Sequence, residues 1–119
     1  FFIELRTNLS NIQIKAVMEE EKLYHESSLT VRALAKYVAS QEYLVRKAIN
    51  NHLGYRNFSE FLNHYRISET SQLLVGTKEP ITTIGLNVGY TSLSSFYKAF
   101  KAIHDVTPKE YRAQHSSTS

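Results

Sequence analysis

The sequence has no cysteine or tryptophan and only 2 prolines, 4 glycines and 1 methionine in 119 residues. Without cysteine, neither disulfides nor thiolate zinc ligands are available, and a reducing compartment is the natural environment. No apolar run approaches the ~20 residues that a membrane-spanning helix needs, and no signal-peptide pattern is present. There is no low-complexity linker either. These absences predict a cytoplasmic, soluble chain whose 42% apolar residues can bury a core, as one domain or two very small ones.

Enzymes and metalloproteins also lack their usual signatures here. The histidines form neither an HExxH motif nor a compact cluster, so surface positions are expected for His25, His52, His64, His104 and His115. Serines and carboxylates are present, but no nucleophile elbow, Walker motif or glycine-rich dinucleotide motif accompanies them. The sequence therefore predicts no metal, no cofactor and no catalytic activity.

The net charge of +3 is small but unevenly distributed. Residues 1–30 carry 3 basic and 5 acidic groups, whereas residues 31–119 carry 11 basic and 6 acidic groups. A basic body is compatible with a polyanionic partner, although many ordinary domains are equally basic. Net charge alone therefore does not distinguish a polyanion-binding chain from an ordinary basic domain, and the pattern of residues is needed.

The chain begins with FFIEL rather than Met, which suggests a piece of a longer protein. A first helix is predicted over residues 11–24, with Ile12, Ala16 and Leu23 along one side and the EEEK run on a solvated face. We expect this helix to cover the residues that follow it. A dimer seam in the parent protein is the alternative.

Helical periodicity dominates the remaining residues and predicts an all-α fold with about seven helices. Thr30 is expected to cap a helix that ends near Val38, and Gly54 to end a helix over residues 41–52. After a break at Pro80, further helices are expected over residues 81–88, 92–103 and 108–114. The tail from residue 115 is expected to fray.

The longest predicted helix covers residues 57–76. Asn57 and Glu60 have the N-cap and N3 spacing of a helix start. Its apolar side is formed by Phe61, Leu62, Tyr65, Leu73 and Leu74.

Two segments flanking this long helix repeat the pattern of a helix-turn-helix, in which small residues mark the helix crossing and the turn, and apolar residues mark the core. The first segment supplies Leu34, Ala35, Val38, Ala39, Val45 and Ala48. The second supplies Ile84, Gly85, Val88, Gly89, Phe96 and Ala99. One such pattern is weak evidence, but two of them with a long helix between them indicate a structural duplication.

The residues that the core does not use repeat as well, at an offset of fifty-one. In the first segment an inward side is predicted for Val45, Ala48 and Ile49, and an outward side, the first stripe, for Tyr43, Arg46, Lys47 and Asn50. In the second segment the inward side is Phe96, Ala99, Phe100 and Ile103, and the second stripe is Ser94, Tyr97, Lys98 and Lys101. Neither stripe contains a carboxylate.

Such stripes suit double-stranded DNA. A helix about 10–12 Å wide fits a major groove about 12 Å wide, where Arg and Lys donate to guanine or phosphate and Asn pairs with adenine. A linking helix of about 19 residues spans roughly 28 Å. That length is close to the ~34 Å between successive major-groove faces, so one chain could contact two adjacent grooves.

Four blocks carry a family resemblance: LTVRALAKYV, HLGYRNFSEFLNHYRI, PITTIGLNVGYTSLSSFYKAFK and VTPKEYR. Over residues 29–112 the chain resembles the DNA-binding domain of the AraC/XylS transcription regulators. The resemblance implies helix-turn-helix subdomains over residues 29–55 and 80–112, joined by the linker helix 57–76. It also implies that the helices at 41–52 and 92–103 enter consecutive major grooves. By matching position, the base-reading candidates are Tyr43, Arg46, Lys47, Leu93, Ser94, Ser95 and Lys98.

The resemblance also bears on partners. It implies operator or promoter DNA for this chain and RNA polymerase for the full-length protein, with residues 1–28 a candidate remnant of the link to an upstream domain and residues 113–119 a tail. We expect the chain itself to be monomeric and to hold no small molecule. Four residues depart from the family pattern. Ala39 and Asp105 replace glycines, and Gly85 replaces an alanine. Leu93 stands where a polar base-reading residue is more typical, and apolar contact with a thymine methyl group is one role open to it.

Other interpretations remain open. The stripes could bind an acidic protein surface, which would make the chain a helical protein-interaction module. Tyr43 and Tyr97 could lie flat over the scaffold rather than face DNA. Arg66 and Arg112 are expected to serve the structure, as partners of helix ends or of carboxylates such as Glu69.

Overall fold

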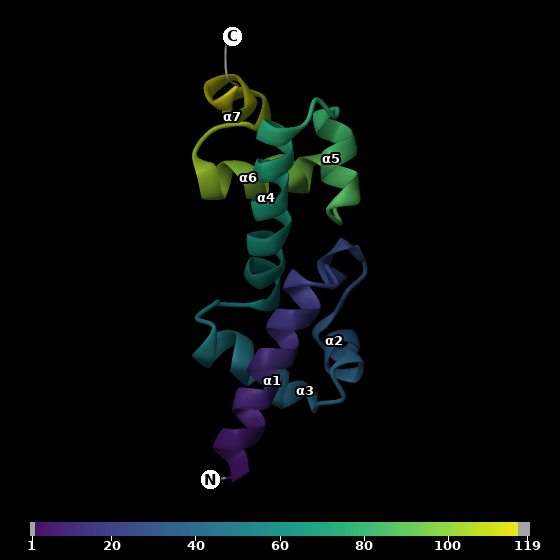
Figure 1. Ribbon diagram of the computed structural model, residues 1–119, viewed down its shortest axis with the longest axis vertical. Coiled ribbons are helices and arrows are strands. Elements are labelled where there is room, and N and C mark those ends of the chain that lie inside the picture. Colours follow the sequence, from purple (N-terminus) through teal and green to yellow (C-terminus); the bar gives the residue numbers. More distant parts are fainter. Residues whose placement is uncertain (1, 117–119) are drawn as a thin grey trace. The chain divides into compact units, whose positions relative to one another are not determined.

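The computed structural model describes residues 2–116. Within this range the chain forms seven α-helices, one 3₁₀ helix and one π-helical segment, with no strand (Figure 1). The all-α prediction is confirmed. Contacts divide the chain into two compact units, one formed by Ser28–Leu62 with the residues up to Tyr24, the other by His25–Ser27 with the residues from Asn63 onward.

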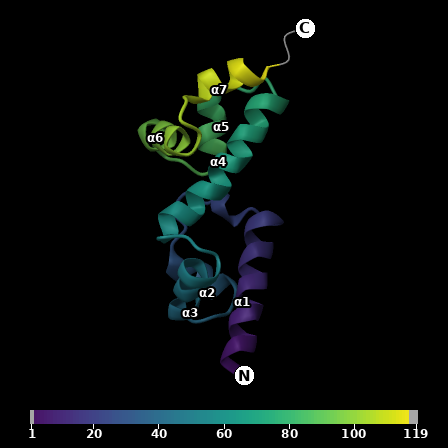
Figure 2. The same cartoon turned by 90° about the vertical axis from the view of Figure 1, so that its left-hand side faces the viewer.

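The first unit contains α1 (Phe2–Glu19), α2 (Val31–Tyr37), α3 (Glu42–Lys47) and the π-helical segment η2 (Ala48–His52). The short 3₁₀ helix η1 (Leu23–His25) follows α1. Helix α1 contacts both α3 and η2, and Figures 1 and 2 show it running alongside them. The expectation that the first helix covers the residues following it is therefore confirmed.

The predicted bounds and packing side of this first helix were wrong. Ile14, Val17 and Met18 are buried, whereas Ile12 is 64% exposed. The buried residues have i, i+3, i+4 spacing on a face that the prediction did not use. The helix ends at Glu19, and Lys22 adopts a left-handed φ of 53°. Leu23 therefore lies in η1 and does not share the predicted helix face with Ile12 and Ala16.

The first helix-turn-helix starts as its sequence predicts. The Thr30 hydroxyl accepts a hydrogen bond from the Ala33 amide at 3.1 Å, and α2 ends before Val38. The second helix differs from the prediction, because only residues 42–47 are α-helical and residues 48–52 continue as η2. The Leu53 amide donates to the Ala48 carbonyl at 2.9 Å, five residues back. Gly54 then ends the segment with a φ of 83°, as expected.

The long helix α4 (Phe58–Gly76) begins where its cap predicts, because the Asn57 side chain accepts from the Glu60 amide at 2.8 Å. Its first turns belong to the first unit, where Phe61 and Leu62 are buried. Its later turns belong to the second unit. There Ile67, which the sequence prediction omitted, is fully buried.

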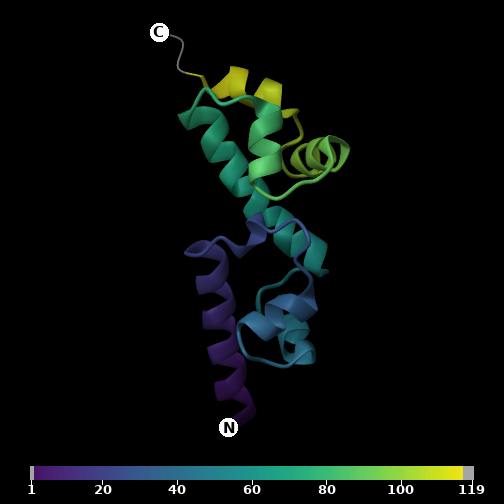
Figure 3. The same ribbon diagram turned by 90° about the vertical axis from the view of Figure 1, so that its right-hand side faces the viewer.

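The second unit contains α5 (Ile81–Asn87), α6 (Leu93–His104) and α7 (Pro108–His115), grouped around the later turns of α4 (Figure 3). Ser92 caps α6, and Thr107 and Glu110 form a capping box at the start of α7. The buried core consists of Ile67, Leu74, Ile84, Val88, Tyr90, Phe96 and Phe100. The three predicted helices are thus confirmed. Residues 117–119 of the predicted tail lie outside the described residues.

The predicted inward position of Ile103 was wrong, since its side chain is 48% exposed. Helix α7 places Tyr111 against Phe100, with ring centroids 5.4 Å apart, and against His104 at 4.8 Å. This ring cluster covers the side of α6 on which His104 lies. Ile103 therefore remains beside the core rather than in it.

Gly85 provides the first test of this packing. A Cβ placed on Gly85 would lie 2.6 Å from the Phe96 ring, whereas one on Gly76 would meet nothing within 4 Å. We expect Gly85→Ala to lower the free energy of unfolding by about 1–3 kcal/mol, because the buried ring must shift. Gly76→Ala, the matched control, should be neutral or stabilising by up to about 1 kcal/mol. Urea unfolding measures both, and equal effects would contradict the close contact.

Ala39 provides the second test, because its φ of 53° is left-handed. An alanine side chain disfavours this conformation and glycine does not. Ala39→Gly should therefore raise the free energy of unfolding by about 0.5–1 kcal/mol. Ala33→Gly, in the exposed part of α2, should instead lower it by about 1 kcal/mol. A loss of stability in both variants would show that the turn carries no strain.

Candidate nucleic-acid interface

The first stripe lies on the outer side of α3 and η2. Its four residues, Tyr43, Arg46, Lys47 and Asn50, are all exposed. The predicted inward residues Val45, Ala48 and Ile49 are all buried. The division between an inner and an outer side is thus confirmed for this helix. Tyr43 is 64% exposed, which does not fit a ring lying flat on the scaffold.

Arg46 has a partner within its own helix. Its guanidinium lies 2.9 Å from the Glu42 carboxylate, one turn earlier, and both side chains are solvent-accessible. An exposed pair of this kind contributes at most about 1 kcal/mol, so it orients Arg46 without locking it. Glu42 adds a carboxylate beside the stripe that the sequence prediction missed. The i, i+4 spacing of Glu42 and Arg46 was the available signal.

The second stripe lies on α6, where Ser94, Tyr97, Lys98 and Lys101 are exposed. The neighbouring candidates Leu93 and Ser95 are exposed as well. Tyr97 lies neither flat on the scaffold nor fully in solvent. Its ring lies 5.4 Å from that of Phe96, yet 40% of the side chain remains exposed. The scaffold thus supports one side of the ring and leaves the other accessible.

Two arginines outside the stripes hold the fold, as predicted. Arg112 donates through Nε to the Leu74 carbonyl at 3.0 Å and through a terminal nitrogen to the Thr77 carbonyl at 3.3 Å. It therefore caps the end of α4. Arg66 is buried and donates to the Glu26 carbonyl at 3.0 Å.

The turn before α6 is fixed to α4 through Tyr90. Its hydroxyl donates to the Asn63 side chain at 2.5 Å, and the Arg66 guanidinium lies 5.5 Å from the centre of its ring. Burial raises the pKa of Tyr90 to about 12, against the opposing effect of the nearby Arg66 charge. The phenol therefore keeps its proton, and hence its hydrogen bond, at neutral pH. This contact positions the start of α6.

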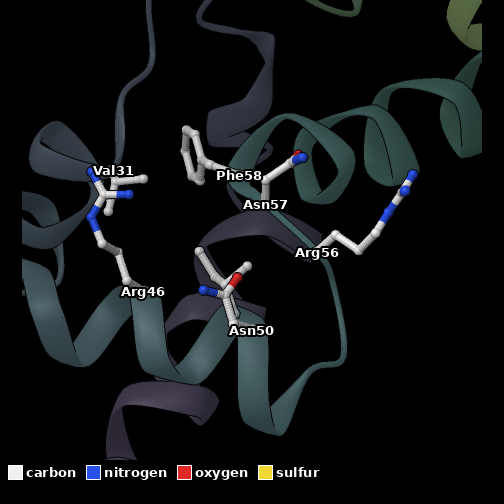
Figure 4. A pocket seen from close by; sticks show the side chains of 7 residues that line it. Val31, Arg46, Asn50, Arg56, Asn57 and Phe58 are labelled. Atoms are coloured by element: carbon white, nitrogen blue, oxygen red, sulfur yellow. The ribbon is translucent and has the colours of Figure 1, made fainter.

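A pocket of about 130 Å³ lies beside the first stripe and is lined by Val31, Arg46, Ile49, Asn50, Arg56, Asn57 and Phe58. Figure 4 shows Arg46 and Asn50 on one side and Phe58 and Asn57, from the start of α4, on the other. Arg56 points away from them and lies 2.8 Å from Glu60. The loop before α4 thus adds amide and cationic groups next to the stripe. The pocket was not predictable from the sequence, because its lining comes from separate segments of the chain.

Other kinds of site have little support in residues 2–116. No group of three or more His, Cys, Asp or Glu side chains is arranged to hold a metal there. None of the helices in this range combines the length and apolarity needed to cross a membrane.

The chain is similar to known proteins along most of its length. A family model described as a helix-turn-helix domain matches residues 34–114. An uncharacterized HTH-type transcriptional regulator of Staphylococcus aureus is 35% identical over 104 residues, which are 87% of this chain and 14% of that protein. The HTH-type transcriptional regulator MtrA of Neisseria gonorrhoeae is 37% identical over 54 residues, 45% of this chain and 18% of that protein. The chain therefore spans only a small part of these relatives.

Solved structures share the fold. The C-terminal domain of AraT, a response regulator from Geobacillus stearothermophilus, has a TM-score of 0.80 and 25% identity, covering 93% of this chain and 88% of that one. A transcriptional regulator from Chromobacterium violaceum, described among AraC-type DNA-binding domain-containing proteins, has a TM-score of 0.77 and 24% identity. That comparison covers 92% of this chain and 95% of the other.

Proposed function

Because the chain belongs to the AraC-type helix-turn-helix family, a family of sequence-specific DNA-binding domains rather than of enzymes, we propose that its two stripes form the surface that contacts double-stranded DNA. The observation that supports this most is the repeat of exposed cationic and hydrogen-bonding groups at one offset. Lys47 and Lys98 are equivalent residues on the helices that follow the two turns. We propose that α3 with η2, and α6, enter consecutive major grooves.

The residue types suggest a role for each stripe. In the first, Arg46 and Lys47 can donate to guanine, Asn50 can pair with adenine, and Tyr43 can reach a base edge or a phosphate. In the second, Ser94, Ser95 and Lys98 are proposed to contact bases, with Tyr97 and Lys101 at the edge of the contact.

The pocket beside the first stripe extends this surface. Phosphate contacts position a protein on the duplex, whereas base contacts give the sequence preference. Arg56 and Asn57 lie on the loop next to Asn50 and are suited to phosphate oxygens. The exposed pair between Arg56 and Glu60 is weak enough to open for such a contact.

The parent protein is proposed to be a cytoplasmic transcription regulator in which residues 29–112 form the DNA-binding domain. Residues 1–28 would then connect it to an upstream domain, and RNA polymerase would be a partner of the full-length protein. A protein-interaction module that binds an acidic protein surface is the alternative. Selection of bound duplexes from a random pool at moderate salt separates the two, because only a sequence-specific DNA binder enriches a motif.

The paired lysines give the sharpest test of the DNA surface. If both read bases, Lys47→Ala or Lys98→Ala should weaken binding to the selected duplex by about 1–3 kcal/mol and relax the preference in one groove only. If they hold phosphates, affinity should fall equally for all sequences, and the salt slope should shrink by about 0.9 per lost contact. Titrations of fluorescent duplexes at several salt concentrations distinguish the two roles.

Lys15→Ala is the matched control, because Lys15 is an exposed lysine of α1 outside both stripes. It should leave affinity and sequence preference close to those of the unmodified chain. A Lys47→Ala, Lys98→Ala double variant that keeps its circular dichroism spectrum and binds DNA unchanged would refute the proposed surface. It would favour the protein-interaction module.

We further propose that this chain is monomeric, because the apolar side of α1 is covered by its own unit. Ile14, Val17 and Met18 are buried, and the helix contacts α3 and η2. Sedimentation equilibrium at micromolar concentration should give a mass near 13.7 kDa. A mass twice as large would point to a dimer seam that includes the exposed Ile12.

A further inference from the structure

In each stripe one residue has a neighbour one turn earlier in the helix, and the two resulting pairs differ in character. On α3, Glu42 and Arg46 form a charged pair one turn apart, with 2.9 Å between nitrogen and oxygen. Fifty-one residues later, the equivalent positions on α6 hold Leu93 and Tyr97. These two side chains are 39% and 40% exposed. An ion pair in one repeat thus corresponds to an exposed apolar pair in the other.

The fold does not require an apolar residue at position 93. Leu93 lies outside the buried core of the second unit and outside the apolar residues that pack against it. The start of the helix is provided by Ser92, whose hydroxyl accepts from the Ser95 amide at 3.3 Å. A single exposed leucine is common on protein surfaces. Here, however, an exposed aromatic residue, Tyr97, follows one turn later on the same face of the helix, and we refer to the two as the apolar patch.

The position of this patch on α6 suits base reading. Leu93 is the first residue of the helix. The N-terminal residues of a recognition helix are those that contact base edges. The ring of Tyr97 lies beside the buried ring of Phe96, with centroids 5.4 Å apart, so the patch borders the core. Ser94 and Lys98, which are both exposed, lie along one side of it and add hydrogen-bonding groups.

An aliphatic side chain can recognise one feature of the major groove, the C5-methyl group of thymine. The corresponding pair on α3 fits other bases, since Arg46 can donate to guanine and Glu42 can accept from the amino group of cytosine. We propose that Leu93, flanked by Tyr97, reads a thymine methyl, so that the preferred DNA site is asymmetric. In that site the groove occupied by α6 contains the thymine and the groove occupied by α3 contains a G·C pair. This inference rests on the proposed function.

Replacement of thymine by deoxyuridine tests the inference directly, because it removes the methyl group and keeps the base pairing. The preferred duplex is first selected from a random pool with the chain itself. Each thymine of that duplex is then replaced singly by deoxyuridine, and the dissociation constant is measured at fixed salt. We expect a loss of about fourfold at one or two positions, the effect of one buried methyl group. The positions should lie where Lys98→Ala alters the sequence preference, not where Lys47→Ala does.

Two leucine variants identify the side chain responsible. Leu93→Ala should bind the thymine and deoxyuridine duplexes equally well, because the methyl group has lost its partner. Leu86→Ala is the matched control: Leu86 is 57% exposed on α5, outside both stripes. It should keep the full sensitivity to deoxyuridine. Circular dichroism confirms that both variants are folded.

Each contrary outcome has its own meaning. A chain that selects a DNA motif but tolerates deoxyuridine at every position would refute the thymine reading and leave the proposed function intact. Undiminished sensitivity in Leu93→Ala would overturn the assignment to Leu93. No enriched motif in the first selection would instead overturn the proposed function itself.

Discussion

Both helix-turn-helix motifs depend on a close crossing of two helices, which is possible only where a small residue stands at the crossing. In the second unit the available space is almost nil, since a Cβ on Gly85 would lie 2.6 Å from the Phe96 ring. In the first unit the equivalent positions are Ala35 and Val45, so a larger crossing residue accompanies a smaller core residue. Gly85 with Phe96, and Ala35 with Val45, thus occupy equivalent helix crossings in the two motifs. This packing fixes which side of α3 and of α6 faces outward.

Since the core takes only one side of each helix that carries a stripe, the other side can vary in chemistry without a loss of packing. The second unit shows how firmly that inner side is held. Phe96 and Phe100 are fully buried, and the Tyr90 hydroxyl ties the preceding turn to Asn63 on α4. The outer side carries serines, lysines and a leucine that make no contribution to this core. Two helices that turn equivalent positions inward can therefore present different groups to a partner.

Features that depend on residues close together in the chain were predictable from the sequence. The caps at Thr30 and Asn57 and the start of α5 after Pro80 follow from the chemistry of single turns. The predictions were wrong where contact with a distant segment determines which side of a helix is buried. Helix α1 turns Ile14 rather than Ile12 inward, and Ile103 is left exposed because α7 covers the other side of α6. The exposure of both stripes was predictable from periodicity. The pocket beside Asn50 was not, because its walls come from segments that are separate in the sequence.

The equivalence of the two stripes also has a structural limit. Lys47 is the last residue of α3, after which the chain continues as η2, whereas its counterpart Lys98 lies within the continuous helix α6. Asn50 lies in the π-helical segment η2, where the wider turn changes the direction of the side chains, whereas its counterpart Lys101 is still α-helical. The side chains of the two stripes thus correspond best at Lys47 and Lys98, and the correspondence is lost one turn later. At that point Asn50 joins Arg56 and Asn57 around the pocket, so the end of the first stripe belongs to a local surface that the second unit does not repeat.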